Sequence, residues 1–435
     1  MFAYYFELAL RSLRRSKILT GLMVLAIALG IGASMTALTV LHVLSGNPLP
    51  DRSAALYYPQ IDPRDMNGYT PDKSRPLDQV SWIDGMNLLQ ARRADRQALM
   101  TGGRVAVQLD SAMLDPFYTD ARYTTADFFP MFGVPFQYGR AWTAADDEAE
   151  ARVVVISQEL NQKLFGGKDS SGQTLRLSGS AFRVIGVLGD WRPNPHFYDL
   201  NRMNYNENEG VYLPLSTSQV VGLEHDGSSD CWGNGGSGLR PDHSAPCVWL
   251  QFWVQLDTVA KAAAYKSFLI HYSEEQKALG RFQRPPNVRL PDLTQWLDDN
   301  QVVPDDVRLQ TWLAFGFLLV CLVNTVGLML AKFMRRAAEL GIRRALGASR
   351  RALFGQLLME SGVIGLAGGV CGLLLAVAGL ALVRRQQASY ASLAHLDTVM
   401  LLATFVLALA ASLLAGLLPA WRACQVAPAL QIKST

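Results

Sequence analysis

The stretch closest to a nucleotide-binding loop is Gly166-Gly167-Lys168-Asp169. A phosphate loop needs G-x4-G-K-[ST], so that backbone amides cradle the phosphates and the hydroxyl binds magnesium. The first glycine and the hydroxyl residue are missing, and a turn after a helix is expected instead. The sequence also lacks the H-E-x-x-H, G-x-S-x-G and protein-kinase patterns. We therefore expect no nucleotide site, no catalytic residue and no bound cofactor or metal in this chain, which is not predicted to be an enzyme.

Cys231 and Cys247 are the two cysteines of the long polar middle of the chain, and His225 and His243 lie near them. Their separation does not match the C-x2-4-C spacing that zinc sites favour. In an oxidising compartment two such cysteines usually pair. A disulfide is the preferred prediction, with a zinc site or unpaired thiols as alternatives. The other three cysteines lie in or beside apolar segments and are interpreted as small apolar residues: Cys321, Cys371 and Cys424.

Glu360 is the one acidic residue inside the long apolar segments of the sequence. A secondary transporter or proton pump would need buried carboxylates near the middle of the membrane. Glu360 lies near the start of its segment, which favours an interfacial or helix-packing position over an ion pathway.

A basic stretch over residues 335–351 is predicted to form a short helix that ends at Gly347, with Ser349 capping the next helix. Its apolar stripe comprises Ala338, Ile342, Ala345 and Leu346. Its charged stripe comprises Arg336, Glu339 and Arg343, with Glu339 and Arg343 at a favourable i, i+4 spacing. Such a rod between two membrane helices could transmit force from a cytoplasmic partner. The alternative is a basic loop that only fixes the orientation in the membrane.

The segments that must position these residues are strongly apolar. The chain has 435 residues, of which 50% are hydrophobic and 18% charged, whereas soluble domains have about 25% charged residues. Four segments reach the roughly 20 residues that cross a bilayer: 18–45, 309–332, 353–383 and 399–421. The first is too long for a signal peptide and lacks a clear cleavage site, so we expect a retained anchor.

Basic residues outside the polar middle are unevenly distributed. Thirteen lie near the two termini, in the loop 333–352 or at Lys332 beside it, and two lie in the loop 384–398. The positive-inside rule places the termini, including the tail 422–435, and the loop 333–352 in the cytoplasm. The block 46–308 has 25 Lys and Arg against 33 Asp and Glu, and is expected on the outer side. Because no basic stripe with interleaved aromatic residues occurs, nucleic acid is not an expected partner.

The fold class predicted is a polytopic α-helical membrane protein with four transmembrane helices. A large mixed α+β extracytoplasmic domain is inserted between the first and second of them. Within it the patterns predict helices at 78–93, 157–165 and 259–279, and strands at 104–109, 152–156, 174–177, 182–188 and 248–256. Residues 222–247 form a Gly/Ser-rich insertion, expected to be a long surface loop.

Two further patterns concern helix packing. Residues 1–17 are predicted to form a cytoplasmic amphipathic helix lying at the membrane surface, or else a simple extension of the first membrane helix. In the third membrane helix, small residues at four-residue spacing predict close helix contacts, within one chain by default or across a dimer: Gly365, Gly368, Gly369 and Gly372. In the fourth, Ala408, Ser412 and Gly416 follow the same spacing.

The stretch 335–351 resembles the R-E-[IL]-G-[IV]-R-x-A-[LV]-G-A signature of the FtsX/MacB-like permeases of ABC transporters, and the likeness continues through residues 356–360. The tail Pro428-Ala429-Leu430 resembles the family's terminal element. Within the middle block, residues 128–135, 139–143, 153–157 and 183–190 are similar to the MacB-type periplasmic core domain. The chain departs from the family at Ala338, where Arg or Thr is common, and in the insertion 222–247.

The resemblance implies a permease without a nucleotide site, working by mechanotransmission. A separate cytoplasmic ABC ATPase would hold ATP and Mg, and a second permease would complete a homodimer or a paralogous heterodimer. The implied location is the bacterial inner membrane, with the large domain in the periplasm. The implied ATPase-coupling residues are Arg336, Glu339, Gly341, Ile342, Arg343, Arg344, Ala345 and Gly347.

Export of peptides, antibiotics or similar molecules is the leading functional expectation. A periplasmic adaptor and an outer-membrane channel are further partners that such export would use. Lipoprotein extraction from the membrane is an alternative. A second alternative is a non-transporting signal relay that controls a cell-wall hydrolase or a sensor.

Overall fold

The computed structural model describes residues 16–71, 73–109, 115–202, 208–233, 242–385 and 398–425. It divides into two compact units. One comprises Met1–Ser45 with Val303–Thr435, and the other is Gly46–Val302. Residues 1–15 of the expected amphipathic helix at 1–17 lie outside the described residues, and so do most of the loop 384–398 and of the tail 422–435.

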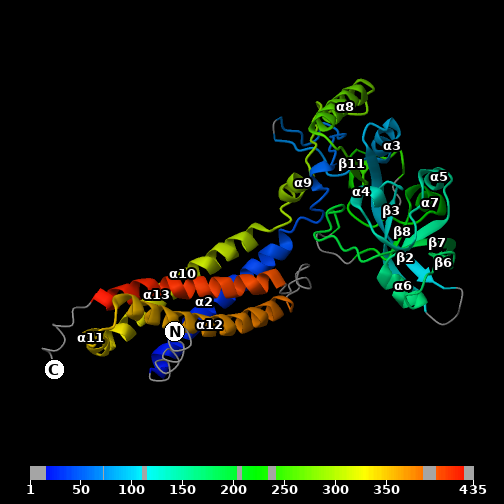
Figure 1. Cartoon of the computed structure of the whole chain (residues 1–435). Helices are drawn as coiled ribbons and strands as arrows, with labels where there is room; N and C mark the ends of the chain where they lie inside the picture. Colours follow the sequence, from blue (N-terminus) through cyan, green and yellow to red (C-terminus); the bar gives the residue numbers. More distant parts are fainter. Residues whose placement is uncertain are drawn as a thin grey trace. The chain divides into compact units, whose positions relative to one another are not determined.

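The first unit is helical, and the fold class expected from the sequence is confirmed. Among the described residues, four helices are long and apolar enough to cross a membrane. They are α2 (Lys17–Leu44), α10 (Asp305–Arg335), α12 (Arg350–Val383) and α13 (Thr398–Gln425) (Figure 1). The helices extend beyond the apolar segments into charged turns. In α10, Asp305 and Asp306 lie in the first turn and Lys332 and Arg335 in the last, which suits the helix dipole.

Glycines set the contacts of α12 with its neighbours. A methyl group at Gly368 would lie 2.6 Å from Ile27 Cγ2 of α2, and one at Gly372 would lie 2.9 Å from Ile31 Cγ2. The other pair faces α13, because a methyl group at Gly369 would lie 2.7 Å from Ala408 Cβ. A methyl group at Gly365 would collide with the side chain of Ser412. Two overlapping small-residue motifs thus serve two neighbours of the same chain.

The second unit is a mixed sheet with surrounding helices. Within the described residues nine strands form one sheet, in the order β1-β11-β2-β3-β8-β5-β7-β4, and β6 pairs with both β2 and β7. The strands are β1 (Leu56–Tyr57), β2 (Arg96–Gln108), β3 (Phe117–Thr124), β4 (Phe136–Gly139), β5 (Val153–Ile156), β6 (Thr174–Leu177), β7 (Ser180–Leu188), β8 (Val211–Pro214) and β11 (Gln251–Gln255). Because β6 bridges β2 and β7, six strands close into a ring: β2-β3-β8-β5-β7-β6. Apolar side chains such as Val107, Leu177 and Val184 pack in its core.

Short helices complete this domain: α3 (Trp82–Ala91), α4 (Phe128–Phe132), α5 (Ala144–Glu148), α6 (Gln158–Phe165), α7 (Leu215–Val221), α8 (Val259–Ala278) and α9 (Leu293–Asp299). Helix α6 begins where Ser157 accepts a hydrogen bond from the Leu160 amide and ends at Gly166, which has φ +65°. The turn expected at Gly166-Gly167 is therefore present, since a left-handed residue ends the helix at no steric cost for glycine.

Three expected elements differ in extent. The helix expected at 78–93 is shorter, because Ser81 caps it from outside. The strand expected at 104–109 is part of the longer β2. The strand expected at 248–256 was wrong as one element. It breaks between β10 (Cys247–Val248) and β11, where Val80 exchanges backbone hydrogen bonds with Leu250.

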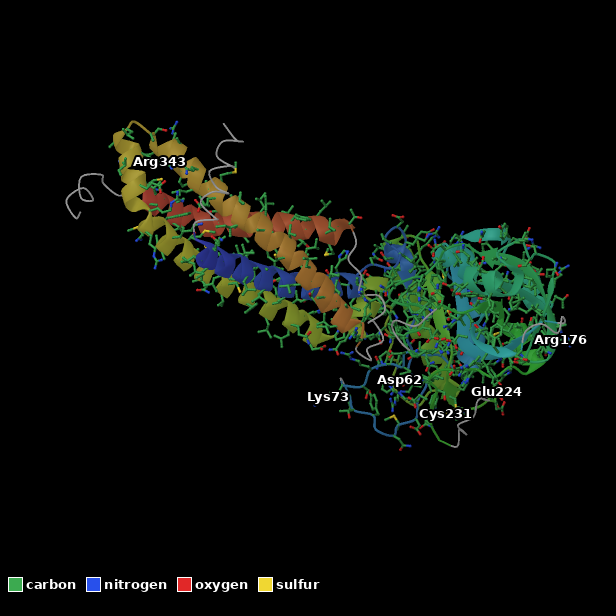
Figure 2. The ribbon with its side chains drawn as sticks, turned by 90° about the horizontal axis from the view of Figure 1, so that it is seen from below. Asp62, Lys73, Arg176, Glu224, Cys231 and Arg343 are labelled. Carbon is green, nitrogen blue, oxygen red and sulfur yellow. A yellow bond between two sulfur atoms is a disulfide. The ribbon has the colours of Figure 1, made fainter. Side chains whose placement is uncertain are left out.

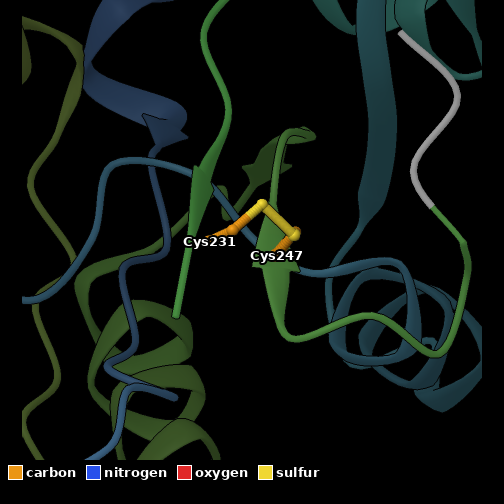
Figure 3. Close-up of a disulfide and its surroundings, with 2 residues drawn as sticks. All are labelled: Cys231 and Cys247. Carbon is orange, nitrogen blue, oxygen red and sulfur yellow. A yellow bond between two sulfur atoms is a disulfide. The ribbon is translucent and has the colours of Figure 1, made fainter. Parts of the chain in front are cut away.

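The insertion 222–247 is not wholly irregular, which corrects the expectation of a simple loop. Its described part contains β9 (Asp230–Cys231), which pairs antiparallel with β10. Cys231 lies opposite Cys247, and a disulfide joins them (Figure 3). The disulfide therefore joins the two ends of the segment 231–247. Residues 234–241 of this segment lie outside the described part.

A charged cluster is buried inside the domain. Arg122 of β3 is fully buried. Its Nη1 donates to Asp199 Oδ2 at 2.8 Å, and its Nη2 donates to Glu209 Oε1 at 2.5 Å. The hydroxyls of Tyr198 and Tyr212 donate to Glu209 Oε2 at 2.7 and 3.2 Å. The cluster ties β3 to the segments before β8, and its polar atoms have the partners that burial demands.

Candidate functional site

The stretch singled out from the sequence forms helix α11 (Ala337–Ala345), between α10 and α12. Gly347 ends the stretch in a left-handed conformation, with φ +98°. The hydroxyl of Ser349 then accepts a hydrogen bond from the Ala352 amide at 3.2 Å, which starts α12. Figure 2 shows Arg343 of this helix at one end of the four-helix unit.

The charged stripe of α11 is bonded to its own chain. Arg343 Nη2 donates to Glu339 Oε1 at 2.7 Å, and Arg343 Nη1 donates to Gln356 Oε1 of α12 at 3.3 Å. Arg336 Nε donates to Glu339 Oε2 at 3.4 Å. Glu339 thus lies between two guanidinium groups, and Arg343 connects α11 to α12.

A buried carboxylate anchors this network. Glu360 of α12 is 1% exposed, and Lys332 of α10 is 3% exposed. Lys332 Nζ lies 2.5 Å from Glu360 Oε1, and Arg336 Nη1 donates to Glu360 Oε2 at 3.1 Å. One carboxylate therefore binds a cation from the end of α10 and another from the start of α11. The contacts fix the angle at which α11 leaves α10.

Ile342, Ala345 and Leu346, the described members of the apolar stripe, face away from the chain. Ile342 is 59% exposed and Leu346 is 83% exposed, and Ala345 and Gly347 are exposed as well. Among the α11 side chains that the structure describes, Leu340 turns inward, where it is 5% exposed and packs with Leu357 and Phe333. An amphipathic helix normally buries its apolar face and solvates its charged one. Here the order is reversed, which leaves an apolar surface open beside a charged, internally bonded one.

A further bond reaches the last membrane helix. Arg344 Nη1 donates to the backbone carbonyl of Cys424, in α13, at 3.3 Å. Helix α11 therefore contacts α10, α12 and α13, and a displacement of α11 would act on all three.

The structure divides the predicted coupling residues into two groups. Arg336, Glu339, Arg343 and Arg344 are partly buried and bonded within the chain. Ile342, Ala345 and Gly347 are exposed, and Gly341 is partly buried. The sequence predicted an interfacial or helix-packing position for Glu360, but not its partners Lys332 and Arg336. It also did not predict the bond between Arg343 and Gln356, and it left Leu346 out of the site. The signal was available, since a lysine and a glutamate within apolar helices must find partners.

Neither unit offers a metal centre within its described part: no group of three or more His, Cys, Asp or Glu could hold an ion. His225 and His243 lie near the disulfide in sequence but do not form such a group among the described residues. What the described residues of the site present is a set of ion pairs and an exposed apolar helix face.

Comparison with known families decides the identity of the chain. Residues 20–267 match the MacB-like periplasmic core domain, and residues 312–428 match the FtsX-like permease C-terminal domain. The chain belongs to the MacB-like family of ABC transporter permeases. The second match contains the whole of α11, and the first contains most of the domain inserted between α2 and α10 of this MacB-like permease.

Individual relatives are distant. The pyoverdine export ATP-binding/permease protein PvdT of Pseudomonas aeruginosa is 21% identical over 85% of this chain and 50% of its own length. The macrolide export ATP-binding/permease protein MacB of an Azoarcus species is 23% identical over 98% of this chain and 58% of its own. This MacB-like chain thus spans about half the length of the curated relatives it matches.

Among solved structures, the periplasmic region of MacB from Actinobacillus actinomycetemcomitans aligns with 58% of this chain and 94% of that one. The identity is 18% and the TM-score 0.36. The extracellular domain of the transporter YknZ from Gram-positive bacteria aligns with 54% of this chain and 99% of that one, at 12% identity and a TM-score of 0.35.

Proposed function

We propose that this chain is the permease subunit of an ABC exporter that works by mechanotransmission. A separate cytoplasmic ATPase binds ATP and Mg and docks on α11. Closure of the ATPase moves α11, and the membrane helices pass this movement to the inserted domain. The permease itself supplies no nucleotide site and no catalytic residue.

The observation that carries the proposal is the reversed amphipathicity of α11. Ile342 and Leu346 are large apolar side chains that remain mostly exposed at the end of a helical bundle. Exposed apolar surface of this kind, rimmed by charged residues, is typical of a protein interaction site. We assign docking to Gly341, Ile342, Ala345, Leu346 and Gly347.

The charged residues of α11 have a different role in this proposal. Arg336, Glu339 and Arg343 hold the helix against α10 and α12 through Glu360 and Gln356. They are positioning residues, which keep the docking face rigid so that force applied to it reaches the membrane helices. A loosely tethered helix would absorb the displacement instead of passing it on.

The proposed setting is a bacterial inner membrane, with both termini and α11 in the cytoplasm and the inserted domain in the periplasm. The excess of basic residues around α11 supports this orientation. A second permease, either a copy or a homologue, would give the two ATPases their symmetric partners. A periplasmic adaptor and an outer-membrane channel complete the proposed route.

The substrates proposed are peptides, antibiotics or similar molecules. Two relatives support export as the direction of transport, since their names describe pyoverdine export and macrolide export. Within the described apolar segments of the membrane helices, Glu360 is the one carboxylate, and it is paired with Lys332 and Arg336. We therefore expect the cargo to be taken up from the outer side.

The test begins with a pull-down of the full chain from its native membranes to identify the ABC ATPase that binds it. The two proteins are then co-expressed and purified, and ATP hydrolysis is measured in liposomes. Ile342→Glu should abolish co-purification of the ATPase, because a carboxylate would replace an apolar contact at the centre of the docking face. The matched control is Val259→Glu, which makes the same change at an 82% exposed position of the inserted domain.

Orientation needs its own measurement. A cysteine introduced at Leu346 should react with a membrane-impermeant maleimide only after the cells are lysed, whereas one at Tyr118, 68% exposed in the inserted domain, should react in cells with a permeable outer membrane. Labelling in the opposite order, or unchanged ATPase association in Ile342→Glu, would refute the proposed coupling.

A further inference from the structure

The inserted domain contains a cavity of about 430 Å³ that the coupling mechanism does not use. Its walls come from residues between 64 and 68, from Ser74 and Arg75, from Trp232 and Gly233, and from Arg284. Two chain segments contribute to the wall, and Figure 2 labels Asp62 and Lys73 on one of them and Cys231 on the other. A volume in this range suits a small organic ligand.

Three arginines line the cavity: Arg64, Arg75 and Arg284. Behind them the carboxylate of Asp62 is fully buried. It accepts hydrogen bonds from Arg64 Nε at 2.7 Å and from Arg284 Nη1 at 3.1 Å. Burial raises the pKa of Asp62, but the hydrogen bonds from the two arginines outweigh it and leave the pKa lowered. Asp62 is therefore ionised and is shared between two cations.

The three arginines of the cavity differ in how they are paired. Asp65 adds a second carboxylate to the wall, which accepts hydrogen bonds from the backbone and side chain of Asn67. Arg64 and Arg284 are both bonded to Asp62, and Arg284 is 4% exposed. Arg75 is exposed, and the nearby carboxylate of Asp78 is not hydrogen-bonded to it in any described contact. An anion in the cavity would give the Arg75 guanidinium a directly bonded partner.

The cavity also retains hydrogen-bond donors. Arg284 Nε donates a hydrogen bond to the backbone carbonyl of Asp65, and Arg284 Nη2 donates one to that of Asn67. Arg64 Nε and Nη2 donate hydrogen bonds to the carboxylate of Asp62, and Nη2 also donates to the backbone carbonyl of Arg75. Within the described residues, Nη1 of Arg64 and the guanidinium of Arg75 have no hydrogen-bond partner. These groups can bind a carboxylate in the bidentate geometry that arginine favours.

Trp232 gives the cavity a flat apolar wall. It follows directly on Cys231, and its backbone amide donates to the carbonyl of Pro246 at 3.0 Å. The disulfide between Cys231 and Cys247 therefore holds the indole next to the arginines. Aromatic side chains stack on planar ligands, and guanidinium groups bind their charged ends.

We propose that this cavity binds a small organic anion, a carboxylate carried on a planar aromatic group. Arg64 and Arg75 bind the carboxylate, Arg284 provides the positive field from beneath, and Trp232 stacks on the ring. That this ligand is the exported substrate rests on the function proposed above, whereas the binding site itself does not.

The experiment uses the full chain in lipid nanodiscs and 2-naphthoate as the probe, with binding followed by calorimetry. The neutral analogue 2-naphthalenemethanol tests the need for charge. Arg75→Gln and Trp232→Ala should each weaken 2-naphthoate binding roughly ten-fold or more, the effect of losing a charge-assisted bond or a stacking surface. Arg152→Gln, an exposed arginine outside the cavity wall, is the matched control.

Equal binding of the neutral analogue, or wild-type affinity in Arg75→Gln, would overturn the proposal. So would a loss of affinity in Arg152→Gln as large as that in Arg75→Gln. The two proposals fail separately. If Ile342→Glu keeps its ATPase while 2-naphthoate still binds, the coupling fails and the site stands. If 2-naphthoate does not bind while Ile342→Glu loses the ATPase, the site fails and the coupling stands.

Discussion

Lys332 and Glu360 form a buried ion pair, 2.5 Å from Nζ to Oε1, that joins the end of α10 to the first third of α12. Both side chains are almost fully removed from solvent. Taking two charges out of water is costly, and the pair is tolerated because Arg336 adds a second bond to the same carboxylate. The pair therefore links the base of α11 to the membrane helices.

Glu360→Gln should destabilise the membrane unit, because it leaves Lys332 buried with no carboxylate. Loss of one partner of a buried pair costs about 3–5 kcal/mol. The measurement is thermal unfolding of the detergent-solubilised chain. The control is Glu339→Gln, because the Glu339 side chain is 35% exposed. It should lower the free energy of unfolding by about 1 kcal/mol at most. Equal melting temperatures for Glu360→Gln and the wild type would contradict the structural role of the pair.

Arg343→Glu should uncouple a bound ATPase without unfolding the chain. The change brings two carboxylates together at Glu339 and breaks the bond to Gln356. The rate of ATP hydrolysis by the complex should become equal to that of the ATPase without the permease. The melting temperature of the chain should change little, because Arg343 is partly exposed. Arg343→Lys, which keeps the positive charge beside Glu339, should retain part of the coupling. Arg350→Glu, exposed just beyond the helix, serves as the control; coupling unchanged in Arg343→Glu would exclude α11 from the mechanism.

Gly368→Ala should lower the stability of the membrane unit. Alanine is the better helix former by up to about 1 kcal/mol, but its methyl group would lie 2.6 Å from Ile27 and force α12 away from α2. Overpacking of this kind costs about 1–3 kcal/mol. Gly362→Ala in the same helix meets nothing within 4 Å and should be neutral or stabilising. Thermal unfolding of both variants tests the prediction, which fails if Gly368→Ala is the more stable of the two.

The buried cluster around Glu209 should make the stability of the inserted domain depend on pH. Burial raises the pKa of Glu209, but the charge of Arg122 outweighs it and holds the pKa well below its ordinary value of 4.5. A lowered pKa means that the stabilisation is complete above pH 4.5 and is lost as the pH falls below that value.

Glu209→Gln should therefore be less stable at pH 7 and should lose less stability between pH 5 and pH 3 than the wild type, by chemical denaturation followed with tryptophan fluorescence. Trp253 is buried beside the cluster and reports on it. Glu148→Gln, whose side chain is 74% exposed, should leave the pH profile unchanged. An unaltered slope in Glu209→Gln would remove this cluster as its source.

Removal of the disulfide should destabilise the insertion and loosen the cavity. A bridge that closes a loop of this length contributes about 3 kcal/mol, chiefly through the unfolded chain. The double variant Cys231→Ser with Cys247→Ser should unfold at lower denaturant concentration and bind 2-naphthoate more weakly, since Trp232 loses its anchor. Cys371→Ser, which removes a free cysteine of α12, is the control. Identical denaturation midpoints in the double variant and the wild type would contradict this role.

The architecture follows from local chemistry that is visible in the sequence. Four apolar segments predict the membrane helices, because each must satisfy its own backbone hydrogen bonds in lipid. Ser157, Gly166, Gly347 and Ser349 predict helix ends, because capping depends on one residue and its immediate neighbours. The motif of α11 indicates where a partner would dock, and the small residues of α12 indicate close packing.

Only the tertiary structure decided which faces meet. Gly368 and Gly372 face α2, whereas Gly365 and Gly369 face α13, a choice that no spacing within one helix contains. The sequence places Lys332 and Glu360 in different helices 28 positions apart, and only folding brings their charges together. The same holds for Arg64, Arg284 and Trp232, which meet around one cavity. Local signals act over one helical turn, but ion pairs and cavities depend on distances in space that the packing of whole elements sets.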